Sequence, residues 1–590
     1  MRHFFVGLLA VIGVVAIVGV LGIVGAAVVF VRYTDKPAQL PDAIALTADL
    51  TGGLADEADP DPLSRLLFDR KATLRDFVDA LDRAGNDPRV KSLYVQLGDD
   101  TMALAKTQQV RDAITAFRAK GKVAIAFADT FGEGGPGTRP YYLATACDEI
   151  WLQPLGEVGL TGLRSETPFL KGALDKLGIA AEFEHREEFK TATNSLTETR
   201  MTAPQHEEID GILSSASEQV DQGIAAARKL TPDKVAALVD RGPLMQDEAR
   251  DAGLIDRLGY RDEAMARARS KAGPDAKFMS LSRYLAAAGR PHASGSEIAL
   301  VYGTGLITRD GTGGLSSSTD FTARAVARAL DAAARDADVQ AILFRIDSPG
   351  GSATASETIW REVERARERG KPVIVSMGDV AASGGYYIAA AADKIVAEPS
   401  TLTGSIGVLA GKLVVADLMK KIGITSDSVE RGANAGMFSA TEAFSPQARE
   451  RLNAELDQVY AGFKSHVAAG RKMAPAAVEA VAKGRVWSGA DAKDNGLVDA
   501  LGGYETALRL AREAAHLAAD APVKIVVFPK ERGLTATLAD RLFNRDDDSD
   551  RPSAGAIERG LGAVQTLVAA AQAVLDDPAL LRMPSIGDIR

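Results

Sequence analysis

Two glycine-rich strings in the second half of the chain carry residue types suited to nucleophilic chemistry. Asp-Ser-Pro-Gly-Gly spans residues 347–351, and Ala-Ala-Ser-Gly-Gly-Tyr-Tyr spans residues 381–387. Each follows a short apolar run that predicts a buried strand, and the second string precedes a predicted helix. A serine at such a strand-to-helix turn, here Ser383, holds its hydroxyl clear of other side chains and beside outward-pointing amides. The pattern favours acyl transfer by a serine nucleophile, although Ser-Gly-Gly alone also fits an ordinary turn.

The glycines of both strings allow a substrate carbonyl to approach the backbone closely. Backbone amides in such a position can form an oxyanion hole, in which each donor typically contributes about 3–4 kcal/mol to acyl transfer. We predict that the amides of Gly351 and Gly384 are these donors.

The histidines of the chain offer no partner for this serine. None lies in a motif suited to a Ser-His pair, and the chain has neither a G-x-S-x-G elbow nor an H-E-x-x-H metal site. A serine nucleophile here therefore needs a different base. The six histidines are His3, His185, His206, His292, His466 and His516.

The chain is internally duplicated, and the serine string survives in only one copy. Residues 141–163 and 386–408 align at a constant offset of 245, with nine of 23 positions identical. Gly-Thr-Arg-Pro stands at 137–140, where the later copy has its Ser-Gly-Gly. Other echoes extend the repeat to roughly 200 residues per half, a length that indicates tandem domains and excludes a solenoid of short repeats. Because only one copy has lost the Ser-Gly-Gly string, we expect that the two halves have divided one function between them.

Each half alternates short apolar runs with amphipathic segments. Predicted strands at 341–346 and 372–376 flank a predicted helix at 354–369, and the first half repeats this order with strands at 93–97 and 123–127. Strands that alternate with helices indicate βαβ units and parallel sheets. We therefore predict two tandem α/β domains.

These strings, together with Thr-Gly-Ser-Ile-Gly-Val at 403–408, resemble the signal peptide peptidase A family in its long, duplicated form. The family comprises membrane-bound serine proteases of the Clp protease/crotonase fold, and the resemblance covers about residues 1–525. It implies that lysine activates the serine, that Lys190 is this base, and that Ser405 orients the lysine. The offset of 245 places Lys190 opposite Ala435, so the first half kept the lysine and lost the serine, and the second half did the reverse. Alone, Lys190 would fit a solvated lysine and Ser405 a turn serine.

A lysine acts as a base only when it is neutral. Its usual pKa of about 10.4 must then fall to roughly 7–8, which burial at a domain or subunit interface can achieve. The activity of the enzyme should therefore depend on where the fold puts Lys190.

The beginning of the chain predicts a membrane anchor. Residues 4–31 form a run of 28 uncharged residues between Arg2 and Arg32. As a helix this run would be roughly 42 Å long, enough to cross a hydrocarbon core of about 30 Å, and a cleavable signal peptide has a much shorter apolar region. The flanking charges do not decide the orientation. The family resemblance implies a body on the periplasmic side of a bacterial inner membrane, a homotetramer, and released signal peptides as substrates.

Composition narrows the remaining possibilities. The net charge of −10 argues against nucleic acid as a partner, and the single cysteine, Cys147, excludes disulfides within the chain and Cys-rich metal sites. We expect no metal and no cofactor. The predicted organisation is an anchor (1–36), a first crotonase-like domain that supplies the lysine (37–290), a second that supplies the serine (291–525) and a tail of unknown role (526–590). A crotonase-type acyl-CoA enzyme and an inactive scaffold are the alternatives to a Ser/Lys endopeptidase.

Overall fold

The computed structural model describes residues 40–57, 72–99, 101–309, 321–530, 579–582 and 588–589. Within these ranges no helix is both long enough and apolar enough to cross a membrane. The predicted anchor at residues 4–31 lies outside the described residues.

The first half of the chain builds a six-stranded sheet in the order β10-β1-β2-β3-β4-β9, in which every strand pair is parallel. Its strands are rich in Ala, Val, Ile and Leu because helices cover both faces. The strands are β1 (Ile44–Asp49), β2 (Val90–Leu97), β3 (Val123–Ala128), β4 (Glu149–Leu152), β9 (Arg257–Leu258) and β10 (Lys277–Ser280). The covering helices include α3 (Leu74–Gly85), α4 (Leu104–Ala119), α5 (Thr138–Ala144) and α11 (Arg261–Ala272).

The second half builds an eight-stranded sheet on the path β20-β18-β16-β14-β11-β22, with β17 beside β16 and β21 beside β17. All its strand pairs are parallel except β18 with β20. Its strands are β11 (Ser296–Thr304), β14 (Val339–Ser348), β16 (Val373–Ala382), β17 (Lys394–Ala397), β18 (Leu402–Gly404), β20 (Val486–Ser488), β21 (Ala500–Leu501) and β22 (Val523–Phe528). Its helices include α13 (Ala323–Arg335), α14 (Ala353–Glu368), α15 (Gly384–Ala389) and α20 (Tyr504–Ala514).

The duplication is visible in the structure, and the predicted α/β class is confirmed. The repeated segments become α5 followed by β4 in the first half and α15 followed by β17 in the second. Two long helices also correspond, α8 (Ala203–Arg228) and α17 (Pro446–Arg471), each of 26 residues. Each helix follows a threonine or serine N-cap, has a proline in its first turn, and ends at a lysine in the left-handed backbone conformation. The same capping residues therefore mark both ends of the two helices.

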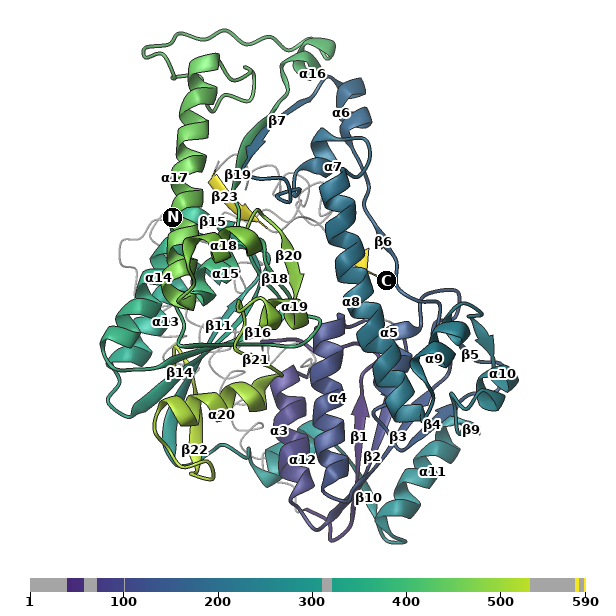
Figure 1. The fold of residues 1–590 in the computed structure, drawn as a ribbon. Helices are drawn as coiled ribbons and strands as arrows, with labels where there is room; N and C mark the ends of the chain where they lie inside the picture. The colour runs from purple at the N-terminus through teal and green to yellow at the C-terminus, as the bar shows by residue number, and fades with distance from the viewer. Residues whose placement is uncertain are drawn as a thin grey trace, which may run out of the picture.

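The two sheets pack around a shared core. Helices α3 and α4 of the first half and α20 of the second lie between the sheets (Figure 1), and their buried side chains join one cluster that also contains β1, β2, β11 and β14 residues. Cys147 is buried in this cluster as a free thiol. The extent of this apolar contact fixes the halves against each other.

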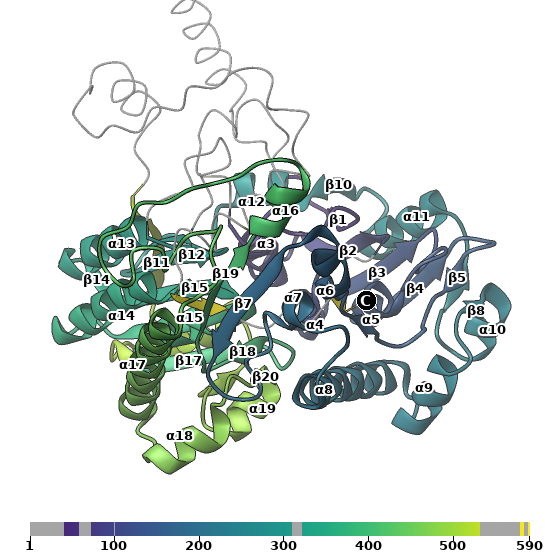
Figure 2. The same ribbon diagram turned by 90° about the horizontal axis from the view of Figure 1, so that it is seen from above.

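A third, smaller sheet joins the halves by backbone pairing. Its order is β13-β12-β15-β23-β19-β7. Strand β7 (Ala180–His185) belongs to the first half, and all six of its residues pair antiparallel with β19 (Leu409–Val414) of the second. Figures 1 and 2 show β7 away from the six-stranded sheet of the first half and beside β19. The other strands are β12 (Ile307–Thr308), β13 (Phe321–Thr322), β15 (Gly350–Ser352) and β23 (Ala579–Arg582).

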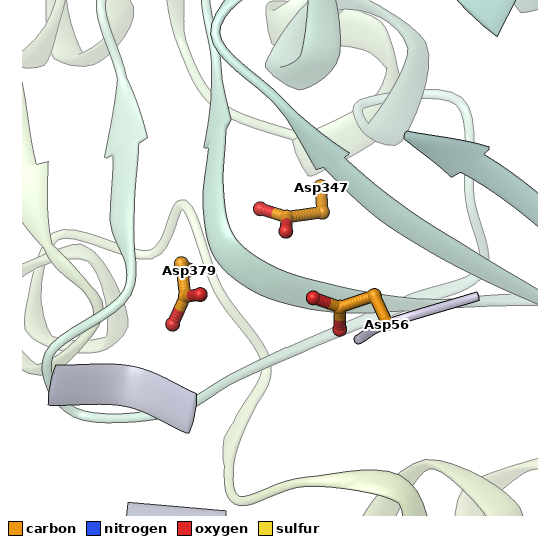
Figure 3. Close-up of side chains that lie close together, drawn as sticks. All are labelled: Asp56, Asp347 and Asp379. Carbon is orange, nitrogen blue, oxygen red and sulfur yellow. The ribbon is translucent and has the colours of Figure 1, made fainter. Parts of the chain in front are cut away.

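A buried cluster of charges also spans the contact between the halves. Asp56 of the first half and Asp347 and Asp379 of the second hold carboxylate oxygens within 4.8 Å of one another (Figure 3). Two cations lie among them. Lys106 Nζ is 2.5 Å from Asp56 and 3.4 Å from Asp379, and Arg345 Nη2 is 3.0 Å from Asp56.

Three carboxyl groups against two cations leave one negative charge in excess, and burial makes that charge costly. Burial would raise the pKa of Asp56, but Arg345 and Lys106 outweigh it and lower this pKa to about 2. Burial and the neighbouring carboxylates Asp56 and Asp379 raise the pKa of Asp347 to about 8. Burial also raises the pKa of Asp379, so the proton that balances the cluster lies on the Asp347–Asp379 pair.

Asp347→Asn is expected to stabilise the protein as pH rises. Because the pKa of Asp347 is raised on folding, its contribution to stability is present below its unfolded pKa and is lost progressively up to about pH 8. An asparagine does not titrate, so its contribution to stability does not change over this pH range. Its carbonyl can still accept the 2.9 Å hydrogen bond from Val380 N. Thermal unfolding should give a Tm gain of about 2 °C or more at pH 8 that disappears near pH 4. The exposed Asp520→Asn is the control, and a pH-independent difference for Asp347→Asn would contradict the assignment.

Candidate active site

Three neighbouring strands of the second sheet end at one place. Strand β14 leads into Gly350 and Gly351, β16 ends immediately before Ser383, and β18 ends immediately before Ser405. Parallel register holds these ends together, with Ser348 opposite Ala381 and Ala382 opposite Gly404. The carboxyl ends of parallel strands are where α/β sheets place their ligands.

The backbone at the serine is held in a rare conformation. Ser383 has φ 55° and ψ −114° at the junction of β16 and α15. Positive φ is uncommon for a residue with a side chain, and such conformations persist only where the surroundings enforce them. Here Ser383 N donates to Gly404 O at 2.8 Å, and the buried Tyr386 hydroxyl ties α15 to Leu497 O at 2.9 Å.

Lys190 reaches the site from the other half of the chain. After β7, Arg186 N donates to Val408 O at 3.0 Å and Phe189 N donates to Lys483 O at 3.1 Å. Gly484 then leaves room for the lysine, since a Cβ at this position would lie 2.5 Å from Lys190 N. The chain therefore enters the second half as a strand and is held there by backbone hydrogen bonds on both sides.

The structure brings the three predicted side chains together. Lys190 Nζ lies 2.8 Å from Ser383 Oγ, 3.0 Å from Ser405 Oγ and 3.1 Å from Ser405 O. All three residues are completely buried, at 0% exposure. A neutral lysine amine at this distance can accept a proton from the serine hydroxyl. Ser405 contacts the same amine through its hydroxyl and its carbonyl oxygen, and its role in orienting the lysine stays a prediction.

Burial supplies the charge state that this chemistry requires. Desolvation lowers the pKa of Lys190 well below its usual range, against the opposing effect of the Glu208 carboxyl. Glu208 is itself buried on α8, and burial raises its pKa to about 8 in spite of a 2.8 Å hydrogen bond from Val486 N. Burial therefore disfavours the charged form of both groups.

The two predicted oxyanion donors lie close together, Gly351 in β15 and Gly384 at the start of α15. A Cβ built on Gly384 would lie 3.2 Å from Gly351 N and 2.6 Å from Ser356 Oγ. A side chain at Gly384 would thus crowd the backbone of β15 and the Ser356 hydroxyl of α14, so the turn after Ser383 favours glycine. The assignment of Gly351 and Gly384 as donors stays a prediction.

The positions that correspond to Ser383 and Lys190 in the opposite half do not form a second site. Thr138, opposite Ser383 at the offset of 245, donates its hydroxyl to Gly162 O at 2.9 Å inside the first half. Ala435, opposite Lys190, lies in an exposed loop, and residues 425–431 form no strand comparable to β7. Only one of the two possible sites is therefore built.

Two residues beside Lys190 could not be identified from the sequence. Glu208 is one of several carboxylates on α8, and Gly484 lies in a turn far along the chain. Nothing in their local sequence marks either one, because their importance comes from contact with Lys190.

Comparison with known proteins matches the chain to the model of peptidase family S49 over residues 116–274 and 365–518, one region in each half. The chain is 30% identical to serine protease SPPA, chloroplastic, of Arabidopsis thaliana over 82% of this chain and 70% of that protein. It is 31% identical to protease 4 of Salmonella typhi over 80% of this chain and 78% of that protein. It is 34% identical to a putative signal peptide peptidase SppA of Enterococcus faecium over 37% of this chain and 63% of that protein.

A serine on a duplicated α/β scaffold, together with these similarities, defines a hydrolase of the serine protease class. The chain belongs to peptidase family S49.

Gly484→Ala is expected to reduce turnover by displacing Lys190. The new methyl group would lie within 2.8 Å of three Lys190 atoms, and a shift of about 1 Å in a catalytic group can cost on the order of 10²-fold in rate. Gly496→Ala is a matched control because Gly496 has φ 79°, close to the 80° of Gly484, but nothing lies within 4 Å of its Cβ. Peptide hydrolysis assays should separate the two variants, and equal losses would mean that backbone strain alone is responsible.

The rate should rise with pH as Lys190 loses its proton, with an apparent pKa well below that of a free lysine. Glu208→Gln removes a carboxyl that becomes negatively charged as pH approaches about 8 and that then opposes this shift, so the upper part of the rising limb should move to lower pH. Glu207→Gln is the control, because Glu207 is exposed and pairs with Arg485. A kcat/KM profile that is flat between about pH 6 and 9 would exclude lysine as the titrating base.

Proposed function

We propose that the chain is a membrane-anchored endopeptidase in which Ser383 is the nucleophile and Lys190 is the general base. The observation that carries this proposal is the 2.8 Å contact between two completely buried groups from different halves of the chain. A serine hydroxyl gains nucleophilicity from a neutral amine, and burial keeps the amine neutral.

The reaction proceeds in two stages. Ser383 Oγ attacks the peptide carbonyl carbon while its proton passes to Lys190 Nζ, and the amides of Gly351 and Gly384 stabilise the oxyanion. The lysine ammonium then gives this proton to the leaving amine as the C–N bond breaks. Water attacks the resulting ester with Lys190 again as base, which frees the acid product and restores Ser383.

The proposed substrates are signal peptides already released from secreted proteins. Two features support this class: the uncharged run at 4–31, and similarity to a relative named as a putative signal peptide peptidase. A protease held at a bilayer meets apolar peptides that partition into the same bilayer. We place its body, with the predicted domains 37–290 and 291–525, on the periplasmic side of a bacterial inner membrane, and we propose a homotetramer.

The decisive experiment combines active-site labelling with mutagenesis. A fluorophosphonate should form one adduct on Ser383, identified by mass spectrometry, and Ser383→Ala should abolish both the adduct and peptide hydrolysis. Lys190→Ala should reduce kcat by about 10³-fold or more, and the double variant should be hardly slower than either single one, since groups that act as a unit are not additive. Labelling also separates a protease from an acyl-CoA enzyme or an inactive scaffold.

Thr138→Ala is the matched control because it removes a hydroxyl at the corresponding position of the first half, and it should leave kcat unchanged. Near-normal turnover of Lys190→Ala would instead show that the first half contributes no catalytic residue and acts only as a scaffold. For the substrate class, removal of residues 1–36 should slow hydrolysis of a vesicle-embedded signal peptide and spare a short soluble peptide. Equal effects on both peptides would refute the role of the anchor.

A further inference from the structure

One residue of the Asp-Ser-Pro-Gly-Gly string, Ser348, has no role in the proposed reaction but lies next to the groups that carry it out. It is the last residue of β14 and is completely buried, at 0% exposure. Parallel register places it opposite Ala381, two residues before Ser383. A Cβ built on Gly385 would lie 3.0 Å from Ser348 O, so the first turn of α15 packs on this serine. Ser348 therefore lies at the same edge of the sheet as the nucleophile.

The hydroxyl of Ser348 bridges the two peptide groups that flank Gly350. Gly350 N donates to Ser348 Oγ at 3.1 Å, and Ser348 Oγ donates in turn to Gly350 O at 3.5 Å. A serine hydroxyl has one donor and two acceptor lone pairs, so it can make both bonds at once. Pro349, between the two residues, has no N–H and a fixed φ, so it neither competes for the hydroxyl nor adds freedom to the turn.

The second of these bonds bears on the direction of a predicted oxyanion donor. The Gly350 carbonyl and the Gly351 N–H belong to one planar trans peptide group, so they point in opposite directions. A hydroxyl that holds the carbonyl on the Ser348 side therefore turns the Gly351 N–H away from Ser348. Strand β15 lies beside the start of α15 (Figures 1 and 2), and a Cβ on Gly384, the other predicted donor, would lie 3.2 Å from Gly351 N.

Two glycines in succession make this direction easy to lose. Gly350 and Gly351 have φ 104° and 156°, values that glycine adopts freely and other residues rarely do. The peptide group between them can rotate as a unit with little steric resistance, and β15 has only three residues to hold it in a ladder. Such a rotation would exchange the carbonyl and the N–H, and would present an oxygen where the oxyanion develops.

We propose that Ser348 is a positioning residue that orients the peptide group between Gly350 and Gly351, so that the Gly351 N–H faces the oxyanion. The proposal rests on the proposed function of the Ser383 site and deepens it. An oxyanion donor acts in the transition state and hardly in ground-state binding, and loss of one donor costs on the order of 10²–10³-fold in kcat. Without the Ser348 hydroxyl the donor is still present but is free to turn away, so the loss should lie at or below this range.

Ser348→Ala tests this proposal, with Ser92→Ala as the matched control. Ser92 is also completely buried in a parallel strand, and its hydroxyl also bonds to the backbone, at 2.7 Å from Ala268 O, but it lies in β2 of the first half. With a soluble peptide, Ser348→Ala should lower kcat about tenfold or more at a KM within about twofold of wild type. Ser92→Ala should leave both constants unchanged. Equal kcat values in the two variants would overturn the proposal.

A peptide aldehyde and the corresponding peptide alcohol separate the orientation of the donor from a general loss of structure. In the aldehyde adduct Ser383 Oγ bonds to the carbonyl carbon, the C=O electron pair moves onto oxygen, and the hydroxyl proton passes to Lys190, so an oxyanion forms in the hole. The alcohol binds without reacting. Ser348→Ala should weaken inhibition by the aldehyde by the same factor as kcat and leave inhibition by the alcohol unchanged. Equal weakening of both would show only damage to the fold and would overturn the proposal.

Ser348→Cys keeps the packing of the side chain but offers only a weak donor and a weak acceptor. Its kcat should lie between those of wild type and Ser348→Ala, and it takes the place of Ser348→Ala if that variant does not fold. A wild-type kcat in Ser348→Cys would contradict the proposal. An aldehyde adduct on wild-type Ser383 with unchanged aldehyde affinity in Ser348→Ala would overturn this proposal alone, whereas absence of any adduct in the wild type would refute the proposed function and this proposal with it.

Discussion

The burial of one lysine amine beside one serine hydroxyl is the constraint on which the rest of this structure depends. An ammonium group without a full counter-charge is costly in a dry site, so Lys190 is stable there mainly as a neutral amine. The backbone must therefore hold it in place, because a neutral side chain has no strong ion pair to do so. Strand β7 on β19 and the backbone bonds from Arg186 and Phe189 provide that hold.

The division of labour between the halves follows from this geometry. In the second half, Ser383 and Ser405 follow the ends of two neighbouring strands. Strand β7 of the first half pairs with β19 of the second half and leads to Lys190. Because Lys190 comes from outside the second sheet, its position depends on a fixed arrangement of the two halves. The shared core, and the buried cluster of Asp56, Lys106 and Arg345, supply that arrangement.

The third sheet ties the two halves together beside the turn that carries Ser383. Strand β15 contains Gly351, which lies next to Gly384, and β19 pairs with β7, the strand that leads to Lys190. Strand β23, residues 579–582, pairs antiparallel with both β15 and β19. The backbone around Ser383 and Lys190 is therefore braced by strand pairing as well as by side-chain packing.

The sequence by itself determined the α/β class and the duplication, and it predicts Ser383 as the nucleophile, because glycine-rich turns after apolar strands have local signatures. Lys190 could be named only by comparing the two halves and through family resemblance, since nothing local distinguishes it from a solvated lysine. Only the tertiary structure decided that Lys190 is buried, that the Glu208 carboxyl and Gly484 lie beside it, and that residues 579–582 pair with β15 and β19. Most of these contacts join segments that are far apart in the chain, and burial, which lowers the lysine's pKa, is a property of the packed chain.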